Sequence, residues 1–222
     1  AFLADFRADP TGNALPTPRG RIELYSDAIA GFDLPDCPGH ASWLPRRDAG
    51  AADHPLFLIS GQPATRLHSQ LDNGAYSLGH KIAGREPVLI HPDDARTRGI
   101  EDGDVVELFN ARGRCLAGAR LTDDIAPGSV FLWTGAWYDP DYSAFQDRDR
   151  HGNPNVLTHD LRTSALSQGP AAHSARVELA RFDAKPPKVM AHEPPEFATS
   201  EEDAVGQRKR TVTKLNAVLS NA

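Results

Sequence analysis

Six short runs that are apolar or alternate apolar with other residues, most of them followed by turn-forming residues, constrain the fold of this chain most strongly. They are residues 55–59, 88–90, 105–109, 114–121, 129–133 and 175–179. Between them only residues 92–99 read as a helix, opened by Pro92 at its first position and ended by Gly99. Many short strands with so little helix favour a barrel over a doubly wound sheet. We therefore expect a mainly β (α+β) fold.

Composition excludes several classes of protein. The chain has 222 residues, of which 40% are hydrophobic and 24% charged, which suits one globular domain with extensions. Its net charge of −6 and lack of a basic stripe argue against nucleic-acid binding. No apolar run approaches the roughly 18 residues of a membrane span. Cys37 and Cys115 are the only cysteines and form no C-x-x-C pair, so we expect two thiols and neither a zinc site nor an iron–sulfur cluster.

The stretch from Gln62 to Gln70, directly after the first strand, is unusually rich in hydrogen-bonding side chains. A connecting turn uses Gly, Asp, Asn and Pro and stops after four or five residues. This stretch instead carries amide, hydroxyl, guanidinium and imidazole groups, which suit a flat heterocycle with phosphates attached. A solvated surface loop is the alternative, and composition does not separate the two.

The order of the motifs carries a resemblance. Residues 60–71, SGQPATRLHSQL, resemble the start of the C-terminal domain of the molybdopterin oxidoreductases, in the branch that reduces S-oxides and N-oxides. Residues 84–95, 99–106 and 153–158 with 163–169 follow in the family's order, and residues 17–26 resemble the segment that leads into the domain. The match covers about residues 17–182. The sequence of the first motif is most similar to that of the biotin and methionine sulfoxide reductases.

This resemblance implies a six-stranded double-psi β-barrel that helps to bind Mo-bis(molybdopterin guanine dinucleotide). It also implies a bacterial enzyme, cytoplasmic or periplasmic with the cytoplasm favoured, which takes electrons from a donor protein or reductant. That enzyme transfers oxygen from a small S-oxide or N-oxide. The chain is then a fragment whose partners include the upstream domains of the same polypeptide. The protein ligand to molybdenum lies upstream, so no catalytic or metal-binding residue is assigned here.

Three segments are expected. Residues 1–54 are an extended arm, with a short strand at 21–25, that packs on the upstream domains. Residues 55–182 are the cofactor-binding barrel. Residues 183–222 are a polar tail with a marginal helix near 205–219. The arm's large apolar side chains need a surface to bury against; they are Phe2, Leu3, Phe6, Phe32 and Trp43.

The resemblance assigns cofactor binding residue by residue. The expected set is Gly61, Gln62, Pro63, Arg66, Leu67, His68, Ser69, Gln70, Asn155 and Gln168. The guanidinium of Arg66 suits a phosphate or a pterin carbonyl, and the amide of Asn155 can pair with the edge of a heterocycle. His68 can hydrogen-bond a ring nitrogen.

Each assignment has a plainer alternative. Arg66 could form a surface ion pair, His68 could be structural, and Asn155 could serve a turn. Trp137 and Tyr138 could wall the pocket or pack in a core. The acids after Pro92 are explained by the helix N-terminus, so no metal is assigned there.

A second function class also fits the fold, since double-psi barrels serve as non-catalytic binding or recognition modules. A gene that extends several hundred residues upstream into a molybdenum-ligand motif would favour the reductase. A start codon just before Ala1 would favour the module.

Overall fold

The computed structural model describes residues 2–45, 53–142 and 148–194. The chain divides into two units, Ala1–Val189 and Met190–Ala222, and only residues 190–194 of the second are described. The expected helix near 205–219 therefore lies outside the described residues. Within the described ranges, no helix is both long enough and apolar enough to cross a membrane.

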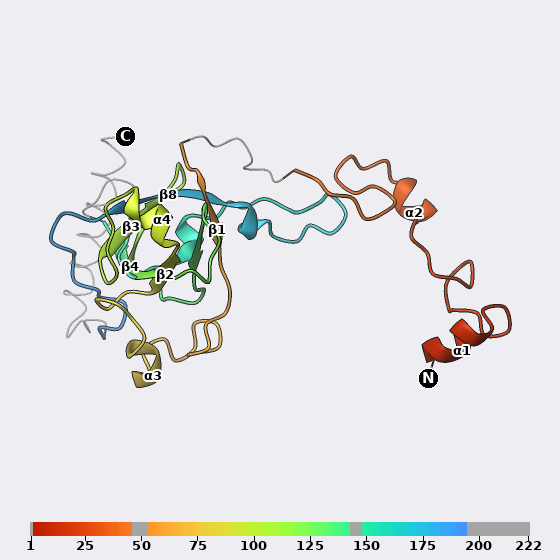
Figure 1. The fold of residues 1–222 in the computed structure, drawn as a ribbon, viewed down its shortest axis with the longest axis horizontal. Coiled ribbons are helices and arrows are strands. Elements are labelled where there is room, and N and C mark those ends of the chain that lie inside the picture. The colour runs from red at the N-terminus through yellow and green to blue at the C-terminus, as the bar shows by residue number, and fades with distance from the viewer. Residues whose placement is uncertain (1, 46–52, 143–147, 195–222) are drawn as a thin grey trace, which may run out of the picture. The chain divides into compact units, whose positions relative to one another are not determined.

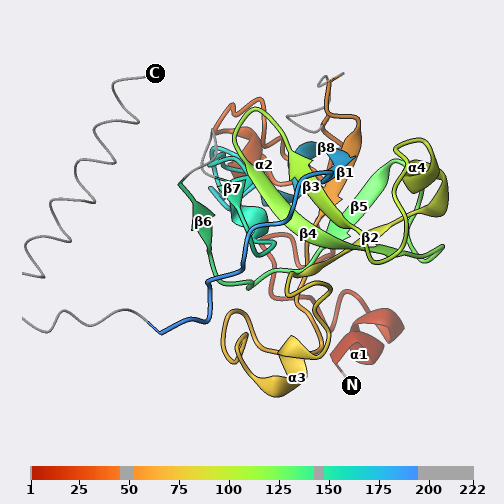
Figure 2. The same cartoon turned by 90° about the vertical axis from the view of Figure 1, so that its left-hand side faces the viewer.

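Six strands of the first unit close into a barrel (Figures 1 and 2). They are β1 (Leu56–Ile59), β2 (Pro87–Ile90), β3 (Val105–Phe109), β4 (Arg114–Leu121), β5 (Ser129–Leu132) and β8 (Arg176–Arg181). Their order is β2-β5-β1-β8-β3-β4, and a parallel pairing of β2 with β4 closes the ring. The pairing of β1 with β5 is also parallel, whereas β1–β8, β2–β5, β3–β4 and β3–β8 are antiparallel. The predicted six-stranded double-psi barrel is confirmed.

Buried and less buried residues alternate along a strand when one of its faces lines the barrel core. In β3, Val106 and Leu108 are fully buried while their neighbours are half-buried. Strand β4 is buried continuously from Cys115 to Ala119. The core also includes Leu56, Leu58, Val88, Ile90, Val130, Leu132, Val177 and Leu179. Both cysteines are free thiols, as expected.

Outside the barrel the elements are short. The helix predicted at Pro92 is present as α4 (Pro92–Arg96), and Gly99 follows it at φ +62°. The others are α1 (Phe2–Ala8), α2 (Asp27–Ala30), α3 (Ala75–Leu78), β6 (Pro140–Asp141), β7 (Arg148–Asp149), η1 (Pro154–Val156) and η2 (Ala172–Ser174). None of these seven was predicted. The strand expected at 21–25 is wrong, because no described segment pairs with it.

The expected arm has little core of its own. Leu15 is the buried large apolar residue among its described positions, whereas Leu24 and Trp43 have about 84% and 85% of their surface exposed. Leu3 and Phe32 are also largely exposed and Phe6 is half-buried, while the side chain of Phe2 lies outside the description. The carboxylate of Asp36 accepts hydrogen bonds from the backbone N–H of Ala165, at 3.0 and 3.2 Å.

Candidate functional site

The candidate site lies where the parallel strands β1 and β5 end. The loops that follow them stay joined, because the backbone N–H of Thr134 donates to the carbonyl of Gly61 at 2.9 Å. The hydroxyl of Ser60 donates to the carbonyl of Leu132 at 2.7 Å. Because β1 and β5 run parallel, their carboxyl ends and the loops that follow them lie side by side. Here they hold the polar stretch after β1 against residues 134–138.

These loops, with the segment around η1, line an open pocket of about 550 Å³. Its lining consists of Gln62, His68, Ser69, Thr134, Gly135, Ala136, Trp137, Tyr138, Asn153 and Asn155. All of these side chains are neutral amides, hydroxyls, aromatic rings or small groups, apart from the imidazole. Such a set offers donors and acceptors at the edge of a flat ring and aromatic surface for its face. It suits a heterocycle better than a phosphate.

Gln62 and His68 are paired within this pocket. The backbone N–H of His68 donates to Oε1 of Gln62 at 3.0 Å, and Nε2 of Gln62 lies 2.9 Å from Nδ1 of His68. His68 has φ +52°, a conformation that side-chain-bearing residues adopt uncommonly. The paired amide therefore supports a backbone conformation that costs free energy and orients the imidazole at the same time.

Gly135 lies close against the backbone of His68. Its φ is +86°, and a Cβ built there would lie 1.9 Å from the carbonyl oxygen of His68. Nearby, the indole N–H of Trp137 donates to the carbonyl of Ser69 at 2.7 Å. The sequence proposal that Trp137 and Tyr138 wall the pocket agrees with their place in its lining.

Arg66 does not line this pocket and belongs to a buried cluster of four charges. Its guanidinium contacts Glu86 at 3.1 Å and Asp72 at 3.4 Å, and Lys81 contacts Asp72 at 2.8 Å and Glu86 at 2.9 Å. All four side chains are at most 3% exposed. These contacts occupy the guanidinium that the sequence assigned to a phosphate or a pterin carbonyl.

The cluster nevertheless supports the pocket. Nη2 of Arg66 donates to the carbonyl of Thr134 at 2.7 Å, and Oδ2 of Asp72 accepts from the backbone N–H of Trp137 at 3.1 Å. Two residues of the pocket wall are thus fixed by charge-assisted hydrogen bonds, which are stronger than neutral ones.

Asp149 organises the segment that carries Asn153 and Asn155. Its Oδ2 accepts from the backbone N–H groups of His151, Gly152 and Asn153, at 3.0, 2.7 and 2.8 Å. Burial raises the pKa of Asp149 above its ordinary value, and hydrogen bonds from four backbone N–H groups partly offset that rise. Asn153 then caps η1 by accepting from the N–H of Asn155 at 3.0 Å.

The structure separates the other predicted residues. Pro63 is buried, and Gly61 leaves room for the ring of Phe131, whose Cζ would lie 2.9 Å from a Cβ. Leu67 and Gln70 are exposed and form a tight turn, with a 3.0 Å backbone hydrogen bond. Gln168 lines a different pocket, of about 490 Å³, with Asp160, Leu161, Arg162 and Pro170.

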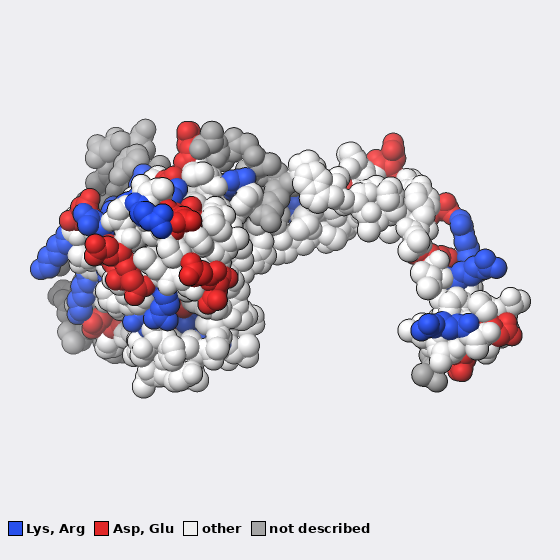
Figure 3. All heavy atoms as spheres, viewed as in Figure 1, with Lys and Arg blue, Asp and Glu red and all other residues white. Residues whose placement is uncertain are grey.

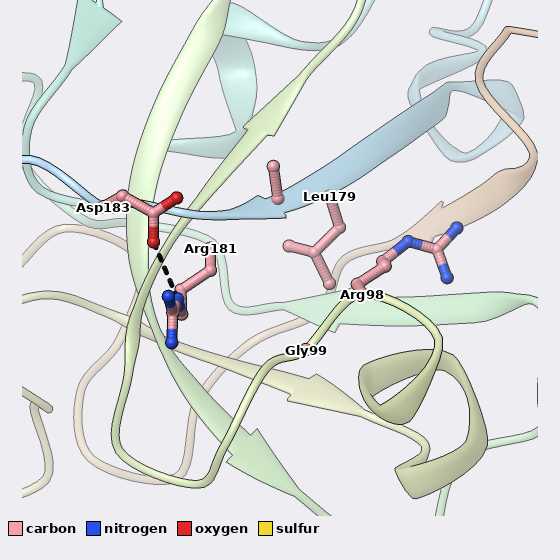
Figure 4. A pocket seen from close by; sticks show the side chains of 6 residues that line it. Arg98, Gly99, Leu179, Arg181 and Asp183 are labelled. Carbon is pink, nitrogen blue, oxygen red and sulfur yellow. Dashed lines mark hydrogen bonds and ion pairs between the residues drawn. The ribbon is translucent and has the colours of Figure 1, made fainter.

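A further pocket, drawn in Figure 4, has its charges paired. Arg181 is directed at Asp183, with Nε 2.8 Å from Oδ1, and Nε of Arg98 lies 2.7 Å from Oε1 of Glu178. On the face drawn in Figure 3, basic and acidic side chains are mixed. This pocket therefore offers a poorer anion site than its two arginines suggest.

Comparison with known proteins identifies the family. Residues 56–176 match the family model described as "Molydopterin dinucleotide binding domain". The chain belongs to this family. The matched range begins at Leu56 in β1, ends at Arg176, the first residue of β8, and includes every residue of the pocket lining.

Several curated proteins that are longer than this chain are similar to it in sequence. It is 42% identical over 196 residues to a trimethylamine-N-oxide reductase of Haemophilus influenzae, a match covering 86% of this chain and 24% of that protein. It is 45% identical to trimethylamine-N-oxide reductase 1 of Escherichia coli K12, covering 80% and 22%. A dimethyl sulfoxide/trimethylamine N-oxide reductase of Cereibacter sphaeroides is 40% identical, covering 88% and 24%. The chain spans about a quarter of the length of these relatives.

A solved structure agrees with this fold. Acetylene hydratase from Pelobacter acetylenicus superposes with a TM-score of 0.58 at 16% identity, covering 76% of this chain and 24% of that one. For a molybdopterin dinucleotide-binding domain the donor set of the pocket is appropriate, because a pterin presents ring nitrogens and a carbonyl that amides and an imidazole can pair with.

Proposed function

We propose that the pocket between the β1 and β5 loops binds one pterin of Mo-bis(molybdopterin guanine dinucleotide). The supporting observation is that Asn155, which is distant in sequence from Gln62, His68 and Ser69, lines the same neutral pocket as these three residues. Trp137 and Tyr138 add aromatic surface. Arg66 acts through Thr134 as a positioning residue. Gln168, which lines a separate pocket, is proposed for a more distant part of the dinucleotide.

The whole polypeptide is proposed to reduce small S-oxides or N-oxides. When bound, the cofactor supplies two electrons, and with two protons the substrate oxygen leaves as water, giving the sulfide or amine. The residues of this chain bind and orient the cofactor. The names of the similar reductases support this class over a non-catalytic module. The biotin or methionine sulfoxide preference, the electron donor and the bacterial cytoplasm or periplasm remain predictions.

The proposal also assigns a role to each of the three segments of the chain. Residues 55–182 form the cofactor-binding barrel and residues 183–222 a tail. Residues 1–54 pack on other domains of the polypeptide, which the exposed Leu24 and Trp43 support. A large apolar side chain gains roughly 1.5–3 kcal/mol when it is buried.

Substitution in the full-length protein tests cofactor binding. The double variant His68→Ala/Asn155→Ala removes hydrogen bonds that contribute about 0.5–1.5 kcal/mol each, so we expect molybdenum and pterin content to fall about tenfold or more. Arg96→Ala, at an exposed residue of α4, serves as the control. Content in the double variant equal to wild type would remove the pocket from the cofactor site.

The same preparations test the reaction. With reduced viologen as donor, wild type is expected to reduce at least one of dimethyl sulfoxide, trimethylamine N-oxide, biotin sulfoxide and methionine sulfoxide. Loaded enzyme that turns over none of the four would contradict the assigned reaction while leaving cofactor binding intact.

A further inference from the structure

The hydrogen bonds between Gln62 and His68 determine which atoms of the Gln62 amide donate. The backbone N–H of His68 reaches one amide atom of Gln62 at 3.0 Å. A backbone N–H can only donate, so the atom it reaches must be the carbonyl oxygen, Oε1. The other amide atom is therefore the NH₂ group, Nε2.

The amide in turn determines which imidazole nitrogen of His68 carries the hydrogen. Nε2 of Gln62 lies 2.9 Å from Nδ1 of His68. An amide nitrogen donates and does not accept, so Nδ1 must present its lone pair. The neutral ring then carries its hydrogen on Nε2.

The Nε2–H group of His68 is available to donate to a ligand in the pocket. Among the residues that the structure describes, no hydrogen bond is found to Nε2 of His68, and the ring lines the pocket. The lining contains no carboxylate that could instead accept a hydrogen from Nδ1. The close approach of Gly135 to the carbonyl of His68 limits movement of the backbone.

We propose that Gln62 is a positioning residue that fixes His68 as an Nε2–H donor. The pocket would then select, at this point, an acceptor atom of a bound heterocycle, either a ring nitrogen or a carbonyl oxygen, and disfavour a donor. The ligand class rests on the proposed function, whereas the tautomer does not. A buried or bound donor facing another donor leaves both unsatisfied, which costs about 1–3 kcal/mol.

Nitrogen NMR of the 222-residue chain, labelled with ¹⁵N-histidine and free of cofactor, tests the tautomer. The chain has nine histidines, and His68→Gln identifies the signal of interest. At about pH 8.5, where free imidazole is neutral, we expect a protonated Nε2 and an unprotonated Nδ1. A protonated Nδ1 in wild type would overturn the proposal.

Free histidine also favours the Nε2–H form, so a variant decides whether Gln62 is responsible. Gln62→Glu keeps an acceptor for the backbone N–H but places a second acceptor opposite Nδ1, so Nδ1 is expected to become protonated. Gln70→Glu, the same substitution at an exposed residue of the same loop, should leave the pattern as in wild type. An unchanged pattern in Gln62→Glu would show that Gln62 does not set the tautomer. Because the measurement uses cofactor-free chain, its failure is distinct from failure of cofactor binding.

Discussion

Replacing Gly135 with alanine is expected to lower the free energy of unfolding by about 2–5 kcal/mol. A residue with a side chain at φ +86° is strained, and its Cβ would stand 1.9 Å from the carbonyl oxygen of His68. Either the loop after β1 or residues 134–138 must move. Urea unfolding of the 222-residue chain, followed by tryptophan fluorescence, measures the loss.

Gly128 supplies the matched control. It has φ +80°, but a Cβ there meets no atom within 4 Å. Gly128→Ala therefore reports the backbone cost alone, about 1–2 kcal/mol. Equal losses in the two variants would mean that the contact between Gly135 and His68 is absent in solution.

The Asp72→Asn variant is the second change with a large expected effect. It removes one charge from the buried cluster while keeping the shape of the side chain, so Lys81 and Arg66 are left sharing Glu86. Breaking a buried ion pair by removing one partner costs about 3–5 kcal/mol. Urea unfolding measures this loss. We also expect lower cofactor occupancy in the full-length protein, because Asp72 accepts a hydrogen bond from the backbone N–H of Trp137 in the pocket wall.

The same substitution at an exposed ion pair is the control. Asp93 pairs with Arg96 at 2.8 Å, with 58% and 73% of the two side chains exposed. Asp93→Asn should cost about 1 kcal/mol or less. A loss in Asp72→Asn no larger than that in Asp93→Asn would contradict a tightly coupled buried cluster.

The six barrel strands could be predicted because their apolar residues run together or alternate, and because most of the strands are followed by a clear turn. Gly99, Gly103 and Gly128 adopt positive φ at such turns. The two-residue strands β6 and β7 carry no comparable signal, because each is defined by its partner strand. The alternation at 21–25 shows the converse: an apolar pattern forms a strand only when a partner lies beside it.

The site was predictable to the extent that its chemistry is local. Gln62, His68, Ser69 and Asn155 were identified from motifs and do share a pocket. Arg66 lies in the same motif, but its burial depends on Asp72 and Glu86, which the sequence does not mark as its neighbours. The positioning role of Asp149 likewise depends on the path of the chain after β7, although the Gly152-Asn153-Pro154 turn was a usable signal.

We propose that the pocket beside His68 holds the heterocycle of the cofactor. A crystal structure of the full-length protein purified with its cofactor tests this most directly. We predict a pterin ring in the pocket, with an acceptor atom within about 3 Å of Nε2 of His68 and an edge facing the amide of Asn155. A cofactor bound elsewhere, with this pocket occupied by solvent or by protein side chains, would contradict the claim.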